Sequence, residues 1–278
     1  MGEFSAGWLR LREPVDRRSR NATVAAALRD HFAGRPRVDV VDIGCGTGAN
    51  LRATAALLGT RQDWCLIDHD PALLDCARDT LATWADTAER DADALVLTHA
   101  GRTITVRFRQ VDLARDVDGA LGDAPDLVTA SAFFDLVSAP FIDALVQATV
   151  RRHAVFHTVL TVSGVHQWSP ETEWDGATSR AFNAHQESDK GFGGAAGPHA
   201  TALLATGFEA AGYRVATGDS PWTLGPADDA LLQELNIGIA GAVAETGPGG
   251  MTLSAQWSTV RRTGAVVGHT DLVAIPPQ

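Results

Sequence analysis

The chain has 278 residues, and 45% of them are hydrophobic, which is enough to bury a substantial core. It carries 23 basic and 34 acidic side chains, a formal net charge of −11, whereas broad contact with nucleic-acid phosphates needs a basic face. No apolar run reaches the roughly 18 residues of a membrane span, and the N-terminus lacks the apolar core of a signal peptide. We therefore expect a cytoplasmic protein with no nucleic-acid partner and no membrane partner.

The cysteine pattern points to packing rather than to cross-links. The sequence contains three cysteines, Cys45, Cys65 and Cys76, and none of them forms a C-x-x-C pair. An odd number with this spacing predicts neither a disulfide framework nor a zinc site. Each cysteine lies in or beside an apolar segment, so we expect them to be small buried hydrophobic side chains.

In chain order, an arginine-rich and helical segment over about 1–37 precedes an apolar, β-branched run at 38–43. Such a run is typical of a buried parallel strand. It ends in glycines at alternate positions, Gly44, Gly46 and Gly48, and a helical pattern then resumes. Because glycine has no Cβ, its backbone can turn sharply and let a ligand approach closely. A strand, a glycine turn and a helix N-terminus together predict a nucleotide-type binding site.

The rest of the chain alternates strands with helices, which predicts an α/β protein with a doubly wound, mostly parallel sheet. One hairpin is expected at about 95–108, with its turn at Ala100-Gly101, and the charged residues 86–93 are expected to be a loop or the frayed end of the preceding helix. A long insert at about 163–199, rich in Gly, Ser, His and Trp, interrupts the alternation. The other expected strands are 64–67, 126–130, 155–162, 213–217 and 265–275, and the expected helices are 71–81, 139–151, 200–211, 226–245 and 250–262.

The string Asp42-Ile43-Gly44-Cys45-Gly46-Thr47-Gly48 resembles motif I of the class I S-adenosylmethionine (SAM)-dependent methyltransferases. In that family the turn lies against the methionine and ribose part of SAM. A carboxylate at the end of the strand suits a ligand with an ammonium group better than one with a pyrophosphate. The resemblance implies one SAM-binding domain over 1–278 with a seven-stranded, Rossmann-like sheet. It also implies an N-terminal helical lid at about 1–37, a substrate-side insert at about 163–199 and a helical insertion at about 225–262.

Several later residues fit the same family. Asp68 ends the second strand, 24 residues after Gly44, and a carboxylate there can accept both ribose hydroxyls. We expect Asp70 to cap the helix that Pro71 opens. The resemblance implies that Asp112 binds the adenine amino group, although a loop-capping role is an alternative. The residues expected to bind SAM are Asp42, Gly44, Cys45, Gly46, Gly48, Asn50, Asp68, His69, Asp112, Leu113 and Ser131, with Arg17, Arg18 or Arg20 for its carboxylate.

Residues 130–136 lie where the family has a motif that touches SAM on one side and the substrate on the other. The segment lacks both the Asn-Pro-Pro-aromatic sequence and the His-His pair of other members, and Phe134 and Asp135 stand there instead. Histidine titrates near neutrality, so His166 or His185 could be a base, or each could be structural. The catalytic candidates are thus His166, His185 and Asp135, and the substrate-binding candidates are Phe134, Trp168, Asn183, Gln186 and Lys190. We predict no metal site.

The sequence therefore predicts a SAM-dependent methyltransferase that modifies an O, N or C atom of a small molecule. One alternative is an NAD(P)-dependent oxidoreductase, because Gly44, Gly46 and Ala49 loosely match the dinucleotide pattern. The single tyrosine, Tyr213, is followed four residues later by threonine rather than lysine, which counts against the short-chain oxidoreductases. A non-catalytic SAM-binding module is the other alternative, and a homodimer is left open as an assembly.

Overall fold

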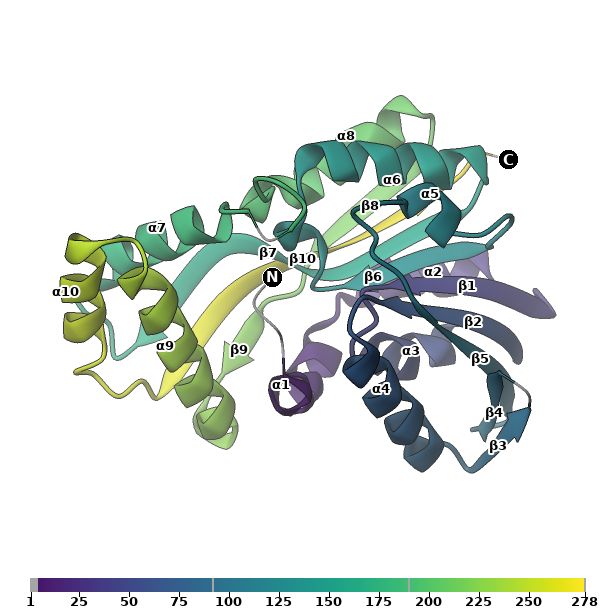
Figure 1. The fold of residues 1–278 in the computed structure, drawn as a ribbon, viewed down its shortest axis with the longest axis horizontal. Helices are drawn as coiled ribbons and strands as arrows, with labels where there is room; N and C mark the ends of the chain where they lie inside the picture. Colours follow the sequence, from purple (N-terminus) through teal and green to yellow (C-terminus); the bar gives the residue numbers. More distant parts are fainter. Residues whose placement is uncertain (1–4, 92, 190, 278) are drawn as a thin grey trace.

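The computed structural model describes residues 5–91, 93–189 and 191–277 as one mixed sheet with helices on both faces (Figure 1). The strands are β1 Arg37–Ile43, β2 Arg61–Asp68, β3 Thr87–Asp91, β4 Ala94–His99, β5 Arg102–Gln110, β6 Leu127–Ser131, β7 Val155–Ser169, β8 Arg214–Asp219, β9 Trp222–Leu224 and β10 Gly264–Ile275. The α-helices are α1 Ala6–Ser19, α2 Ala22–His31, α3 Ala49–Thr54, α4 Pro71–Trp84, α5 Val117–Ala120, α6 Ala139–Arg151, α7 Asp175–Gln186, α8 Ala200–Ala210, α9 Asp229–Ala244 and α10 Pro248–Trp257. Short 3-10 helices are η1 Ala55–Leu57, η2 Phe134–Leu136, η3 Gly197–His199 and η4 Pro226–Asp228.

The centre of the sheet has the strand order β5-β2-β1-β6-β7-β10-β8. Neighbours from β5 to β7 pair in parallel, whereas β10 is antiparallel to both β7 and β8. The expected doubly wound, mostly parallel sheet is thus confirmed. The chain leaves β1 toward β2 and later continues on the other side at β6, so the strand order reverses at β1. Open α/β sheets bind ligands at the carboxyl ends of the strands beside such a reversal.

The sheet is wider than the seven strands expected. β3 and β4 extend it beyond β5, and β9 pairs with β10. β4 and β5 form the expected hairpin, and Ala100 and Gly101 have φ of 48° and 76°, as a tight two-residue turn requires. β3 lies where a charged loop was expected. Every residue of β3 is exposed, so no apolar pattern marked it as a strand.

Helices α2, α3 and α4 cover one face of the sheet, and α5, α6 and α8 cover the other (Figure 1). β1 supplies both cores because successive side chains point to opposite faces. Val38 and Val40 pack with α2, α3 and α4, whereas Val41 and Ile43 pack with α6 and α8. Burial on both faces accounts for the continuous apolar run that predicted this strand.

β7 and β10 continue together beyond the main sheet, on the left of Figure 1, and we call this part with β9, α7, α9 and α10 the extension. β7 runs to Ser169 instead of ending near 162, because His166 and Trp168 pair with β10. The insert expected at about 163–199 therefore begins as a strand. A third hydrophobic core lies mostly within the extension, and its buried residues include Trp222 and Trp257.

The N-terminal segment, expected to be helical, forms two helices. The first ends at Ser19 with Arg20 as its C-cap, and Asn21 caps the second, since its Oδ1 accepts the N–H groups of Thr23 and Val24. α1 packs against β9 and α9 of the extension. Over the described ranges, no helix combines the length and apolar character that crossing a membrane would need.

Candidate active site

The glycine turn is fixed by the neighbouring strand and by one aromatic ring. The Cys45 N–H donates to the Ile67 carbonyl at 2.9 Å, so the turn crosses the end of β2. Gly44 has φ +61°, and a Cβ on it would lie 2.6 Å from Cδ2 of Phe133. The left-handed backbone and the ring both exclude a side chain at this position. Gly48 then serves as the N-cap of α3 with φ +76°.

Asp68, at the end of β2, is buried and oriented by backbone groups. Its Oδ2 accepts the Gly46 N–H at 2.9 Å, and its Oδ1 accepts the Asp70 N–H at 3.1 Å and lies 3.2 Å from Nδ1 of His69. Each carboxylate oxygen keeps further acceptor capacity for a ligand hydroxyl. Asp70 accepts the Ala72 N–H and caps α4, as its sequence position beside Pro71 predicted.

A cavity of about 570 Å³ lies at the carboxyl ends of β1, β2 and β6, and we call it the glycine cavity. Its volume is that of a small-molecule site, for which about 300–1,000 Å³ is usual. α1 contributes Leu9, Arg12 and Asp16 to its lining, and Phe192 closes part of another side. Most residues expected to bind SAM also line it: Gly44, Cys45, Gly46, Asn50, Asp68, His69, Asp112, Leu113 and Ser131.

Asp42 lies beneath the glycine turn rather than on the cavity surface. Asn50 donates from Nδ2 to Asp42 Oδ1 at 2.7 Å and to Thr129 Oγ1 at 3.1 Å, and Arg20 donates to Asn50 Oδ1 at 3.0 Å. Burial raises the pKa of Asp42 to about 7, against the opposing effects of Asn50 and Arg20. This network holds Asn50 at the start of α3, so Asp42 supports the cavity from below.

The charged residues of α1 that reach the glycine cavity are Arg12 and Asp16. Arg12 donates to both oxygens of Asp16, at 2.8 and 3.2 Å, and its guanidinium lies 4.8 Å from the ring centroid of Trp222. The indole N–H of Trp222 in turn donates to Asp16 at 2.9 Å. Arg18, expected near the cofactor carboxylate, instead pairs with Asp228 at 2.7 Å.

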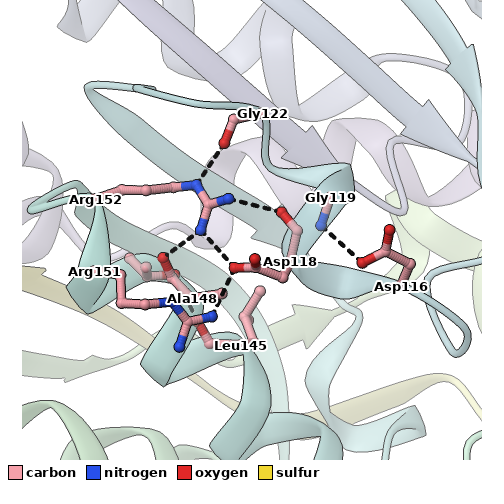
Figure 2. A network of polar contacts seen from close by, with 9 residues as sticks. Asp116, Asp118, Gly119, Gly122, Leu145, Ala148, Arg151 and Arg152 are labelled. Atoms are coloured by element: carbon pink, nitrogen blue, oxygen red, sulfur yellow. Dashed lines mark hydrogen bonds and ion pairs between the residues drawn. The ribbon is translucent and has the colours of Figure 1, made fainter.

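Asp112 and Leu113 lie in the loop between β5 and α5, and α5 is fixed to α6. Figure 2 shows Asp118 of α5 accepting hydrogen bonds from Arg151 and Arg152 at the end of α6, at 2.7 and 2.6 Å. Asp112 itself accepts the Ala114 N–H at 3.2 Å, which is the capping interaction considered for it. The same side chain lines the glycine cavity, so both roles are compatible with its position.

A second cavity of about 530 Å³ adjoins the first, and we call it the aromatic cavity. Arg12, Ala132 and Leu136 line both. Its aromatic walls come from α1, α7 and β9, which contribute one large ring each. These rings are Trp8, Phe182 and Trp222, and the polar lining residues include Asp135, His166, His185, Gln186, Glu234 and His269.

Burial sets the charge of the polar groups in the aromatic cavity. It raises the pKa of Asp135 to about 6, although the backbone N–H groups of Asp135 and Val162 oppose the rise. It lowers the pKa of His166 to about 4 and that of His269 to about 3, so both imidazoles are neutral at pH 7. Within the described part of the chain, Asp135 Oδ1 and the Nδ1 atoms of His166, His185 and His269 have no hydrogen-bond partner.

Comparison with known proteins shows which solved structures have a similar fold. No protein-family model and no curated protein matches the sequence. A cyclopropane-fatty-acyl-phospholipid synthase-like protein of Lactobacillus casei is 15% identical, with a TM-score of 0.53 over 95% of this chain and 99% of that one. The YcgJ protein of Bacillus subtilis is 13% identical, with a TM-score of 0.51 over 93% and 100%. A candidate methyltransferase of Bacillus halodurans is 14% identical, with a TM-score of 0.50 over 92% and 100%.

The chain has the class I methyltransferase fold. This fold brings the three catalytic candidates, His166, His185 and Asp135, to the aromatic cavity, together with Gln186. They come from β7, α7 and the turn after β6, which lie far apart in the sequence.

Several other residues predicted to bind the cofactor or the substrate do not line either of the two cavities. Arg20 lines a charged groove between α1, α3 and α4 that adjoins the glycine cavity through Asp16, Ala49 and Ser131, and Gly48 caps α3. Phe134 is fully buried in the core against Phe156, and Trp168 packs edge-on against Trp257, because both sites face neighbouring helices and strands. Asn183 donates to the Gly164 carbonyl at 3.0 Å. Lys190 lies outside the described residues.

Some residues that line the cavities were not singled out in the sequence. They come from helices and strands that meet only in the folded protein. Arg12 and Asp16 are four residues apart in α1, a spacing that predicts an ion pair on one helix face. That spacing alone does not show that the face borders the glycine turn. His269 carries no local signal beyond its place in a strand. Among residues 5–91, 93–189 and 191–277 of this chain, no three or more potential metal ligands lie together.

Proposed function

We propose that the chain is a SAM-dependent methyltransferase that acts on a small molecule. The observation that carries this proposal is the adjacency of the two cavities, which share Arg12, Ala132 and Leu136. A glycine-lined pocket at the reversal of strand order suits the cofactor. The adjoining aromatic pocket suits an acceptor and favours an enzyme over a non-catalytic binding module.

The polar groups of the glycine cavity match those of S-adenosylmethionine. Asp68 would accept the ribose hydroxyls, and Asp112 with the Leu113 N–H would hold the adenine. Gly46 lets the turn lie close to α1, since a Cβ there would be only 3.0 Å from Leu9 Cδ1. The Arg12–Asp16 pair is complementary to the carboxylate and the ammonium group of the cofactor, so it replaces Arg20 in this role. When bound, the cofactor supplies a methyl group on a sulfonium sulfur.

The protein's own part in the reaction is to position the acceptor, exclude water and take up a proton. The aromatic cavity encloses the acceptor between its indole and phenyl rings, which brings the reacting atoms together and removes solvent. Asp135 lines the aromatic cavity and precedes Leu136, which lines both cavities. Its buried carboxylate is the base that we propose for an acceptor that must lose a proton.

Calorimetry with SAM, S-adenosylhomocysteine and NAD tests the cofactor assignment. We expect micromolar binding of the first two and loss of that binding in Asp68→Ala, because the variant removes the ribose acceptor. Asp30→Ala, which changes an exposed aspartate on α2, is the matched control and should bind as the wild type does. Tight binding of NAD without a response to SAM would instead support the oxidoreductase alternative.

A further inference from the structure

The aromatic cavity has the walls of a site for a flat ring system. Trp8 and Trp222 lie 6.5 Å apart, centroid to centroid, and Trp222 lies 5.1 Å from the ring of His269. On β7, which pairs with β10, the ring of His166 lies 5.4 Å from the ring of Phe182, centroid to centroid. Rings from α1, β9, α7, β7 and β10 thus surround one space. Aromatic side chains arranged in this way favour an aromatic ligand, because stacked and edge-on ring contacts are more favourable than their buried area alone predicts.

The polar groups of this cavity lack the hydrogen-bond partners that buried groups normally have. Asp135 is 5% exposed and His269 is 4% exposed, yet Asp135 Oδ1 and His269 Nδ1 have no partner among the described residues. An unsatisfied buried carboxylate oxygen costs free energy, and a ligand that donates a hydrogen bond to it recovers that cost. The cavity therefore favours a ligand with an O–H or N–H donor near Asp135.

The charges around the cavity disfavour an anionic ligand. Arg12 is the arginine in the lining, and Asp16 together with the cofactor carboxylate that we propose for Arg12 neutralises its charge. Asp135 and Glu234 add negative charge, while His166 and His269 are neutral. A carboxylate ligand would be repelled without a free cation to compensate it, since unpaired buried charges are strongly unfavourable.

From the walls, the unsatisfied Asp135 oxygen and the charges, we propose that the acceptor is an uncharged aromatic compound whose phenol- or enol-type hydroxyl receives the methyl group. This inference rests on the proposed methyltransferase function. The acceptor oxygen donates a lone pair to the methyl carbon while the carbon–sulfur bond breaks. Its proton passes to Asp135 Oδ1, and the sulfur leaves as a neutral thioether. The proton on Asp135 is then released to water when the product leaves.

A hydroxyl fits this geometry better than an alkyl amine. An alkyl amine is protonated at neutral pH and has no free lone pair until it loses that proton. The carboxylates of Asp135 and Glu234 would stabilise the ammonium form and thereby hinder its reaction. A hydroxyl instead binds uncharged and becomes strongly acidic only as its oxygen bonds to carbon, so a nearby carboxylate can accept the proton at that moment.

Calorimetry on the full chain saturated with S-adenosylhomocysteine tests the inference with matched probes. The probes are naphthol, naphthoate, naphthylmethylamine and naphthalene, which share one aromatic body. We expect naphthol to bind about tenfold more tightly than naphthalene, the effect of one hydrogen bond to a charged group, and naphthoate to bind no better than naphthalene. Naphthylmethylamine should bind through its ammonium group, but with S-adenosylmethionine in place of S-adenosylhomocysteine it should be methylated more slowly than naphthol, because the ammonium group has no free lone pair. The inference is overturned if naphthol has no advantage over naphthalene, if naphthoate binds most tightly, or if naphthylmethylamine is methylated faster than naphthol.

Two variants test whether the Asp135 carboxylate causes the preference for naphthol over naphthalene. Asp135→Asn should remove most of the advantage of naphthol over naphthalene, whereas Asp143→Asn, an exposed change on α6, should preserve it. If Asp135→Asn retains the full advantage, Asp135 is not the acceptor group. Should that variant fail to fold, the wild-type ranking of the four probes still decides the acceptor class. Failure of S-adenosylhomocysteine to bind at all would instead refute the proposed function.

Discussion

At the scale of single residues, Gly44 shows how the turn depends on the absence of a side chain. Its φ of +61° costs a non-glycine residue free energy, and a Cβ there would also meet Phe133 at 2.6 Å. Gly101 has φ +76° but nothing within 4 Å of a Cβ, so it isolates the backbone effect from the contact.

We expect Gly44→Ala to lower the free energy of unfolding by about 1–3 kcal/mol more than Gly101→Ala does. The reason is that only the first change adds overpacking against a buried ring to the backbone strain. Urea denaturation followed by circular dichroism measures both variants under the same conditions. Equal losses in the two variants would show that the ring contact is unimportant.

Asp135 predicts a pH dependence of ligand binding. Burial raises its pKa to about 6, so its carboxylate becomes protonated as the pH falls through 6 and loses its charge. In the S-adenosylhomocysteine complex, we expect the affinity for naphthol to fall below about pH 6 and to be constant above about pH 7. Calorimetry at several pH values measures this change.

The control for this pH dependence is Asp135→Asn. Arg12, His185 and Glu234 also line the cavity, and the variant leaves them in place. His166 and His269 stay neutral through this range, because burial lowers their pKa values to about 4 and 3. A variant with the same decline below pH 6 would assign the effect to one of the remaining groups.

At the scale of elements, Arg262 joins the extension's helices to β10. Its side chain is fully buried, lies 4.0 Å from the ring centroid of Trp257 on α10, and donates to Asp175 of α7 at 2.8 Å. The neighbouring Arg261 is 67% exposed and pairs with Asp229 at the surface. The two arginines are therefore a matched pair that differs in burial.

We expect Arg262→Ala to destabilise the protein by about 3–5 kcal/mol, because it leaves Asp175 without its buried partner. Arg261→Ala should cost only about 0–1 kcal/mol, since water solvates both of its ends. Thermal and urea denaturation measure both variants. Comparable effects would contradict the anchoring role of Arg262.

The elements also show where sequence patterns were sufficient. The apolar run of β1 and the turn at Ala100-Gly101 each depend on local chemistry, and both form as expected. β3 and the second half of β7 were missed, because pairing with β4 and β10 stabilises them and their own sequences carry little alternation. Pairing is a property of two segments, so one segment cannot reveal it.

At the scale of the molecule, the two cavities come from different parts of the fold. The main sheet supplies the glycine cavity, the extension supplies most of the aromatic cavity, and α1 contributes Arg12 to both. An N-terminal helix that borders both cavities is consistent with the lid expected for it, which stays a prediction. The net charge of −11 remains the reason to expect no nucleic-acid partner.

The sequence by itself determined the α/β class, the glycine turn and most of the residues around that turn. These features lie within short stretches of chain, where residue type directly limits the backbone. Only the tertiary structure decided which side chains meet at the aromatic cavity. Trp8, Asp135 and His269 are far apart in the sequence, and they face one space because β7 and β10 extend together beneath α1 and α9. Long-range packing sets that arrangement, and no local pattern encodes it.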